Sequence, residues 1–485
     1  MKKLISTLSL LWFAAFSMSM AQQISYSSAQ KLASNWVLTH NQYDYQLLGQ
    51  HKIYDDDGKL LAYRHDLHPQ GYIIVTNNME LPPVIAYSFT SDYTDQEQEI
   101  NPLHEILIAD LKSRFEHLLL MDKSLKDQHH EMWNDILNGA GRKSSFEQWP
   151  PAGSTISGGW LETNWKQSAP YNNFCPMDEV TGSRSIAGCP AVALAMIVNY
   201  QKNLHSTQFS DADDYFHNYA GRQYWIDDDA HVMEFLSFPE MNEYFDSISA
   251  KFLSYTPLNT DEMAALVFAC GVAAKQVYTS EVSGTFGVDQ AYDAYMRFAY
   301  DDAMLIYDSD TSFYTHMKNN MKDGIPVHLA LLVDGAGGGH NVVSDGYNTD
   351  DYYHLNFGWG GSYNGWYLIP EEIPYNLTIV EGAIMDIGVS HVGMDQAIGN
   401  DKVEFSIYPN PSSGVFNILI DMEEPANARI LVCDQKGAII EIITEGYFNR
   451  GKHKYSWNSD LPAGIYNIIV ELSNLISIKK LIINN

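Results

Sequence analysis

Residues 187–198 have the sequence AGCPAVALAMIV, in which a cysteine and a proline precede an unbroken apolar run. Proline is tolerated in the first turn of a helix but not further in, so Pro190 predicts a helix that begins beside Cys189. Unpaired N–H groups and the positive end of the helix dipole lie at such a start, and both favour thiolate over thiol. Cys189 is therefore a candidate nucleophile, although a buried structural cysteine stays open on these residues alone.

A candidate base for this thiol is His340, which follows the glycine-rich residues 335–339 and precedes the strand-like residues 341–344. Consecutive glycines have no side chains to pack and lower the stability of the fold. Their presence is explained if a substrate backbone must approach this segment closely. We therefore expect Gly338 and Gly339 to bind substrate. A flexible loop that carries a surface histidine is the alternative.

Two amide side chains complete the expected site. Asn356, in the sequence HLNFGWGG of residues 354–361, can accept from one imidazole nitrogen and leave the other facing the thiol. Trp359 can shield that bond from water, and we expect it to bind substrate with the two glycines; a β-bend that needs glycine geometry explains the same stretch. Gln167 can donate to an oxyanion beside the backbone N–H of Cys189. We expect no metal and no cofactor, because no histidine pair has ligand spacing with further ligands nearby.

Together these motifs resemble the streptopain family of secreted papain-fold cysteine peptidases. The matching segments occur in the family's order: WKQ at 165–167, PYN at 170–172, AGC at 187–189, GGH at 338–340, DGY at 345–347 and NFGWGG at 356–361. His340 follows Cys189 by 151 positions, close to the roughly 130–150 of papain-like peptidases. The resemblance implies that Cys189 is the nucleophile, His340 the general base and acid, Gln167 an oxyanion donor and Asn356 the orienter of the histidine.

The chain departs from the family at two positions. Phe357 stands where the family usually has tryptophan, beside the catalytic histidine. Phenylalanine keeps an aromatic ring there but lacks the indole N–H. Pro190 stands where valine is common, and proline suits the start of a helix. We expect activity to survive both changes.

The composition and the N-terminus indicate an exported protein. The 485 residues carry a formal net charge of −31, which argues against nucleic acid and anionic membrane surfaces as partners. Two lysines precede an apolar stretch that ends in SMA at residues 19–21, so residues 1–21 are expected to be a signal peptide, with a membrane anchor as the alternative. No other stretch is apolar for long enough to span a bilayer. Four cysteines are too few for a disulfide scaffold, and pairing of Cys175 with Cys270 stays open.

The chain divides into three expected units of an α+β protein. Residues 22–145 resemble the family's inhibitory propeptide, with one amphipathic helix over 103–125 and a small-residue linker after it that favours cleavage near residues 142–146. Residues 146–392 have helices first and antiparallel strands later, and form the papain-like catalytic domain.

The third unit, residues 400–485, is strand-like throughout and predicts a small all-β sandwich. It resembles the type IX secretion sorting domain, through YPNP at 408–411 and PAGIY at 462–466. A carbohydrate- or protein-binding sandwich is the alternative.

The expected protein is a cysteine endopeptidase made as a zymogen. It is secreted or attached to the cell surface after export across the outer membrane. Its expected partners are protein or peptide substrates, its own propeptide as intramolecular inhibitor, and the type IX secretion machinery. A catalytically impaired surface adhesin or binding protein on a peptidase fold is the alternative.

Overall fold

The computed structural model describes residues 23–93, 102–139, 145–254, 256–333, 338–369, 380–388 and 405–483, the last range with gaps at 413, 423, 434–438, 459–460, 463 and 473–474. The expected signal peptide and most of the expected cleavage region lie outside the described residues.

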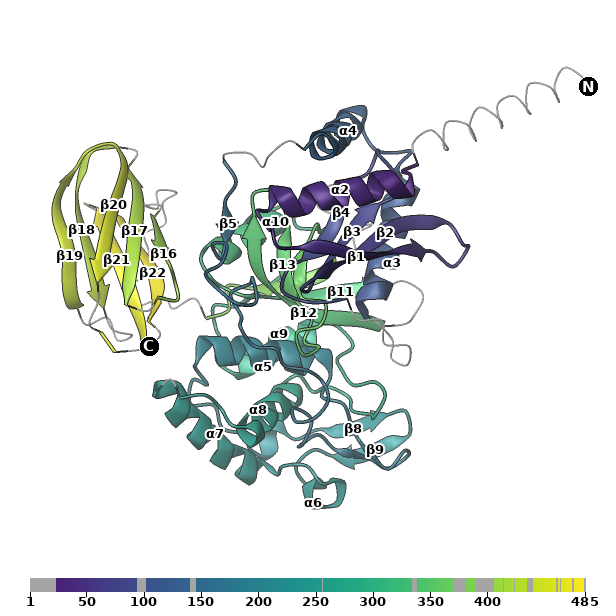
Figure 1. The fold of residues 1–485 in the computed structure, drawn as a ribbon. Coiled ribbons are helices and arrows are strands. Elements are labelled where there is room, and N and C mark those ends of the chain that lie inside the picture. Colours follow the sequence, from purple (N-terminus) through teal and green to yellow (C-terminus); the bar gives the residue numbers. More distant parts are fainter. Residues whose placement is uncertain are drawn as a thin grey trace, which may run out of the picture.

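The N-terminal unit is a four-stranded antiparallel meander covered by helices on both faces (Figure 1). Neighbouring residues of one strand face different layers: Ile73 packs toward α2, whereas Ile74 packs toward α3. Both faces are thus buried, which explains the continuous apolar sequence of the inner strands. Its elements are α2 (Tyr26–Thr39), β1 (Gln46–Tyr54), β2 (Leu60–His68), β3 (Tyr72–Thr76), β4 (Val84–Ser88), α3 (Pro102–His117) and α4 (Lys123–Leu137).

The prediction of one helix over residues 103–125 is wrong. Helix α3 ends at His117, whose carbonyl accepts from the N–H groups of Leu120 and Met121 in a turn, and α4 begins at Lys123. Leu119 is 92% exposed, so the expected apolar stripe does not reach the core beyond α3. A helix in a protein is stabilised mainly by packing of its apolar face, so residues 118–122, which lack such packing, do not continue α3.

The middle unit begins with helices. Helix α5 (Cys189–Gln201) is buried on nearly all sides, because α7 (Phe238–Leu253), α8 (Thr260–Ala273) and α9 (Val288–Arg297) share its core and β12 lies behind it. This surround explains why the apolar run after Cys189 shows no polar face. Three smaller elements complete this half, the hairpin β6 (Met177–Asp178) and β7 (Ser183–Arg184), the hairpin β8 (Phe216–Tyr219) and β9 (Arg222–Trp225), and α6 (Ala230–Met233).

Antiparallel strands form the second half of the middle unit, which confirms the predicted α+β class. Helix α10 (Phe313–Lys322) packs on this sheet. The strands are β5 (Gln148–Trp149), β10 (Met304–Tyr307), β11 (Val327–Val333), β12 (Gly338–Asn348), β13 (Tyr353–Asn356), β14 (Gly365–Tyr367) and β15 (Val380–Met385).

One sheet runs through the first two units. Its strand order is β1-β2-β3-β4-β14-β13-β12-β11-β15-β10, and the two units join where β4 pairs with β14, with Trp366 opposite Tyr87. Helix α3 packs on β2 of its own unit and on β11 of the next, so both units share one apolar core (Figure 1).

The C-terminal unit is the predicted all-β sandwich, with Phe416, Ile430 and Ile468 in a core of its own. One sheet has the order β16-β17-β20 and the other β19-β18-β21-β22. The strands are β16 (Phe405–Tyr408), β17 (Val415–Met422), β18 (Ala426–Cys433), β19 (Ile439–Phe448), β20 (Gly451–Asn458), β21 (Gly464–Leu472) and β22 (Leu475–Ile483).

None of the four cysteines forms a disulfide, so Cys175 and Cys270 do not pair. Among the helices in the described part of the chain, none has both the length and the apolar character needed to cross a membrane.

Candidate active site

Cys189 is the first residue of α5, as the sequence predicts. Gly188 precedes it with φ 84° and ψ 137°, a conformation that glycine adopts without strain. A Cβ at this position would lie 3.0 Å from the Ser283 carbonyl oxygen and from Oε1 of Gln276. The close backbone contact therefore requires glycine, and it fixes where the thiol sits at the start of the helix.

His340 and Asn341 of β12 reach the thiol. The backbone N–H of Asn341 donates to Cys189 Sγ at 3.4 Å, and the His340 ring is hydrogen-bonded to the same sulfur. Burial opposes ionisation of the thiol, but the positive charge of His340 and these hydrogen bonds outweigh burial, so the pKa of Cys189 lies below its ordinary value.

The same pairing acts on the histidine. Burial disfavours the imidazolium, but the Cys189 thiolate, its hydrogen bond and the Phe357 carbonyl together raise the pKa of His340 above its ordinary value. The two groups thus stabilise each other as thiolate and imidazolium, which is the reactive form of a cysteine nucleophile.

Phe357 supports the histidine ring from behind. Its carbonyl oxygen lies 3.3 Å from His340 Nε2, and its ring stacks on the imidazole with centroids 6.1 Å apart and planes inclined by 13°. Trp359 flanks the imidazole at 6.2 Å and 59°. These two rings form an apolar wall around the imidazole.

Asn356 does not bond to the histidine in this structure. Its Nδ2 donates to the Thr163 carbonyl at 2.9 Å, and its Oδ1 accepts from the Gly358 N–H at 3.1 Å. The carboxamide thereby fixes the bend that presents the Phe357 carbonyl to the ring. The expected contact from Asn356 is replaced by a backbone acceptor, which sequence reasoning did not anticipate.

Gln167 lies on a segment that joins the two halves of the site. Its carbonyl accepts from the Ala187 N–H at 2.8 Å, two residues before the thiol. The neighbouring Lys166 forms a β-bridge with Trp359. The half-buried Gln167 side chain therefore starts from backbone that is fixed to both the helix start and the aromatic wall.

The expected substrate-binding glycines begin strand β12. A Cβ at Gly339 would lie 2.7 Å from the Leu331 carbonyl oxygen, so close pairing of β11 with β12 already requires glycine there. Gly338 pairs with Val333 at the end of the same ladder. The rest of the glycine-rich run, residues 335–337, lies outside the described residues.

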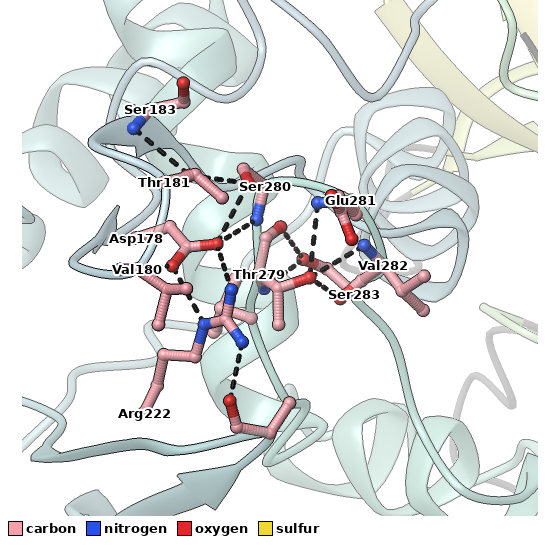
Figure 2. Close-up of polar contacts among 12 residues, drawn as sticks. Asp178, Val180, Thr181, Ser183, Arg222, Thr279, Ser280, Glu281, Val282 and Ser283 are labelled. Atoms are coloured by element: carbon pink, nitrogen blue, oxygen red, sulfur yellow. Dashed lines mark hydrogen bonds and ion pairs between the residues drawn. The ribbon is translucent and has the colours of Figure 1, made fainter.

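A buried carboxylate that sequence reasoning missed anchors the loop beside Gly188 (Figure 2). Asp178 accepts from Arg222 at 2.8 and 2.7 Å, and from the N–H and the hydroxyl of Ser280 at 2.9 Å each. The hydrogen bonds from Arg222 hold the pKa of Asp178 well below its usual range. In turn, the Thr279 carbonyl accepts from the Ile186 N–H at 3.0 Å. Asp178 thereby ties residues 279–283 to the segment that precedes the nucleophile.

Nothing in the sequence marks this anchor, because Arg222 and Ser280 follow Asp178 by 44 and 102 positions. No group of three or more His, Cys, Asp or Glu side chains suited to a metal ion occurs among the residues that the structure describes.

Comparison with known families identifies each unit. Residues 165–367 match the Peptidase C10 family, residues 21–115 the Spi protease inhibitor family, and residues 406–484 the secretion system C-terminal sorting domain. Residues 165–367 belong to the Peptidase C10 family. The predicted combination of streptopain-type peptidase, inhibitory prodomain and sorting domain is therefore confirmed, and the Peptidase C10 domain is that of a cysteine peptidase made as a zymogen. The sorting domain indicates export by the type IX system, followed by secretion or attachment to the cell surface.

Named relatives of this chain are distant. It is 24% identical to streptopain of Streptococcus pyogenes over 337 residues, which cover 66% of this chain and 77% of streptopain. It is 22% identical over 203 residues to the thiol protease/hemagglutinin PrtT of Porphyromonas gingivalis, 41% of this chain and 22% of PrtT. The chain thus spans less than a quarter of PrtT.

Two solved structures from Prevotella intermedia are similar. A prointerpain A fragment matches with a TM-score of 0.45 and 18% identity, covering 70% of this chain and 96% of the fragment. The active interpain A cysteine protease matches with a TM-score of 0.35 and 23% identity, covering 49% of this chain and 98% of that protease.

Proposed function

We propose that this protein is a secreted cysteine endopeptidase that hydrolyses peptide bonds in extracellular proteins. The observation that carries the proposal is the hydrogen-bonded pair of Cys189 and His340 at the start of α5, with a lowered thiol pKa and a raised imidazole pKa. A group of this kind is a nucleophile with its proton donor already in place. The distant relatives whose names denote thiol proteases support the same reaction.

In the first step, the Cys189 thiolate attacks the scissile carbonyl carbon. A carbon–sulfur bond forms, and the carbonyl oxygen becomes an oxyanion. We assign its stabilisation to the backbone N–H of Cys189, which has no acceptor within the first turn of α5, and to the Gln167 side-chain amide. Gln167 is suited to this role because its backbone is bonded to Ala187.

In the second step, the carbon–nitrogen bond breaks, and the His340 imidazolium gives its proton to the leaving amine. The product is a thioester on Cys189. Water then attacks the thioester while neutral His340 accepts the water's proton, which releases the acid and restores the ion pair. Asn356 contributes indirectly, by shaping the bend whose Phe357 carbonyl accepts from the histidine. We assign substrate binding to Gly338 and Gly339, which precede His340 in the chain, and to Trp359, whose ring flanks the imidazole.

For a protein made as a zymogen, we assign residues 1–21 to a signal peptide, 22–145 to the inhibitory propeptide, 146–392 to the peptidase domain and 400–485 to the sorting domain. Strand β5, which starts at Gln148, pairs with β12 of the peptidase sheet, and this supports a boundary before it. We propose activation by cleavage near residues 142–146. N-terminal sequencing of the mature protein tests this site, and a mature start near residue 22 would contradict it.

The decisive test of the function compares activated protein with the Cys189→Ala variant on a quenched fluorescent peptide under reducing conditions. We expect the variant to lose activity by at least about a thousandfold, because no other group supplies the covalent intermediate. Cys270→Ala, which removes a buried free thiol in α8, is the matched control and should keep activity. Equal rates for wild type and Cys189→Ala would exclude the proposal and favour a binding protein on a peptidase fold.

A further inference from the structure

A second polar network reaches the thiol through Asn341, the residue that follows His340 in β12. The backbone N–H of Asn341 lies 3.4 Å from Sγ, and the Asn341 side chain also contributes to lowering the pKa of Cys189. Asn341 lies opposite Ala330 of β11, and Ala330 belongs to the core that surrounds α5. Asn341 therefore extends from the sheet toward the helix that carries the nucleophile.

Two fully buried side chains stand behind Asn341. His328 Nε2 lies 2.8 Å from Asn341 Oδ1, and the Tyr295 hydroxyl lies 3.1 Å from His328 Nδ1. His328 comes from β11 and Tyr295 from α9, so the network Tyr295–His328–Asn341–Cys189 joins four elements. None of the roles assigned above uses Tyr295, His328 or the Asn341 side chain.

The network has one consistent set of proton positions. Burial lowers the pKa of His328 to about 4, so its ring is neutral near pH 7 and has one donor and one acceptor nitrogen. Burial also raises the pKa of Tyr295, which keeps its hydroxyl protonated and able to donate to Nδ1. Nε2–H then donates to Asn341 Oδ1, which leaves the NH₂ group of the same carboxamide as the donor available for the sulfur.

We propose that Asn341 is a further catalytic residue that donates a hydrogen bond to the Cys189 thiolate, and that His328 and Tyr295 are positioning residues that orient its amide. This inference rests on the proposed function, because it concerns the nucleophile of that reaction. A donor bonded to a charged sulfur favours thiolate over thiol, and charge-assisted bonds are the stronger ones. At pH values below the pKa of Cys189, Asn341 thus increases the fraction of enzyme molecules whose thiol is ionised and able to attack a carbonyl.

Few other groups act on these two sites. The thiol is influenced by His340 and Asn341, both from β12, and His328 meets Tyr295 of α9 and Asn341 of β12. The pH dependence of Cys189 reactivity is therefore set mainly by His340 and Asn341. The contribution of Asn341 to the thiol pKa can be measured separately by substituting Asn341.

The test is alkylation of the full-length protein by iodoacetamide, with the rate constant for Cys189 measured by mass spectrometry from acidic to alkaline pH. For Asn341→Ala we expect the rate on the acidic limb to fall about tenfold, with an alkaline plateau close to wild type. For His328→Phe we expect a fall of about threefold, whereas His328→Gln, which keeps a donor for Oδ1, should recover most of the loss. Adding His328→Phe to Asn341→Ala should cause no further fall, because the amide it orients is gone.

Asn320→Ala is the matched control, since Asn320 is a buried asparagine whose amide donates to Asp386 and is not bonded to the network that reaches Cys189. Its profile should match wild type. Misfolding is detected in the same spectra, because unfolding would also expose the buried Cys175 and Cys270 to alkylation.

Superimposable profiles for wild type and a folded Asn341→Ala protein would overturn this inference while leaving the proposed function intact. A wild-type Cys189 that reacts no faster than a buried cysteine even after the propeptide has been removed would instead contradict the proposed function itself. The two failures are thus distinguished by one series of measurements.

Discussion

At the scale of single residues, the most instructive position is Phe357, which provides both a carbonyl and a ring to His340. An aromatic face stabilises a cation above it, so the ring favours the imidazolium over the neutral histidine. We predict that Phe357→Leu, which keeps an apolar side chain but removes the ring, shifts the alkaline limb of the kcat/KM profile to lower pH. The sign follows because a His340 pKa that is raised less loses its proton earlier as pH rises.

The measurement is kcat/KM for a peptide substrate across the pH range. On the alkaline limb we expect Phe357→Leu to be about threefold slower than wild type, and on the acidic limb nearly equal. A uniform fall at all pH values would mean that the ring serves packing alone, since Phe357 is only 1% exposed.

The positions of Cys189 and His340 could be predicted from sequence because each carries a local signal: Pro190 after Cys189 and the glycines before His340. Asn341 has no such local signal, because nothing in the sequence distinguishes it from other asparagines in strands. Its role becomes visible only in the structure, where β11 places His328 beside it. Asn356 was predicted to touch the histidine, but no sequence pattern reveals that a backbone carbonyl serves as the acceptor.

At the scale of elements, the loop of residues 279–283 is held against the start of α5 by Asp178 (Figure 2). We predict that Asp178→Asn lowers kcat/KM by about tenfold, because the loop that borders Gly188 loses its anchor and the site its alignment. Alkylation of Cys189 by iodoacetamide should change by less than about twofold, since the thiol's own hydrogen-bond donors come from β12.

The control for this prediction is Asp213→Asn. It breaks a similar two-bond pair with Arg297, at 2.5 and 2.9 Å, in the same helical half but without a bond to residues 279–283. If Asp213→Asn lowered kcat/KM as much as Asp178→Asn does, the effect would be general destabilisation and not positioning.

At the scale of the whole molecule, the sequence predicts three units but not the sheet that the first two share. Tyr87 and Trp366 pair across the junction although 278 residues separate them. The sequences of β4 and β14 are each typical of an apolar strand within its own unit. The pattern of apolar residues in a strand does not reveal which other strand it pairs with at the edge of a sheet. Pairing of β4 with β14 makes the prodomain an extension of the peptidase sheet, so releasing it requires breaking backbone hydrogen bonds and opening an apolar core.

Arg114 is the buried charge at this junction, and it makes the strength of prodomain docking testable. From α3, its Nε donates to Asp110 at 2.9 Å, and its Nη2 donates to the Leu368 carbonyl of the peptidase domain at 2.7 Å. Removing one partner of a buried pair leaves the other charge uncompensated, which costs about 3–5 kcal/mol. We therefore predict that Arg114→Ala loosens the prodomain and speeds conversion of proenzyme to mature enzyme, followed by gel electrophoresis over time.

Two further variants separate docking from charge. Lys112→Ala, on the same helix, removes an exposed ion pair with Asp56 and should leave the conversion rate unchanged, because exposed pairs contribute little. Replacing both members of the buried pair, Asp110→Leu with Arg114→Met, removes the uncompensated charge and should restore slow conversion, since apolar substitutes for buried pairs are often neutral. Conversion of Arg114→Ala at the wild-type rate would mean that the shared strands and core hold the prodomain without this contact.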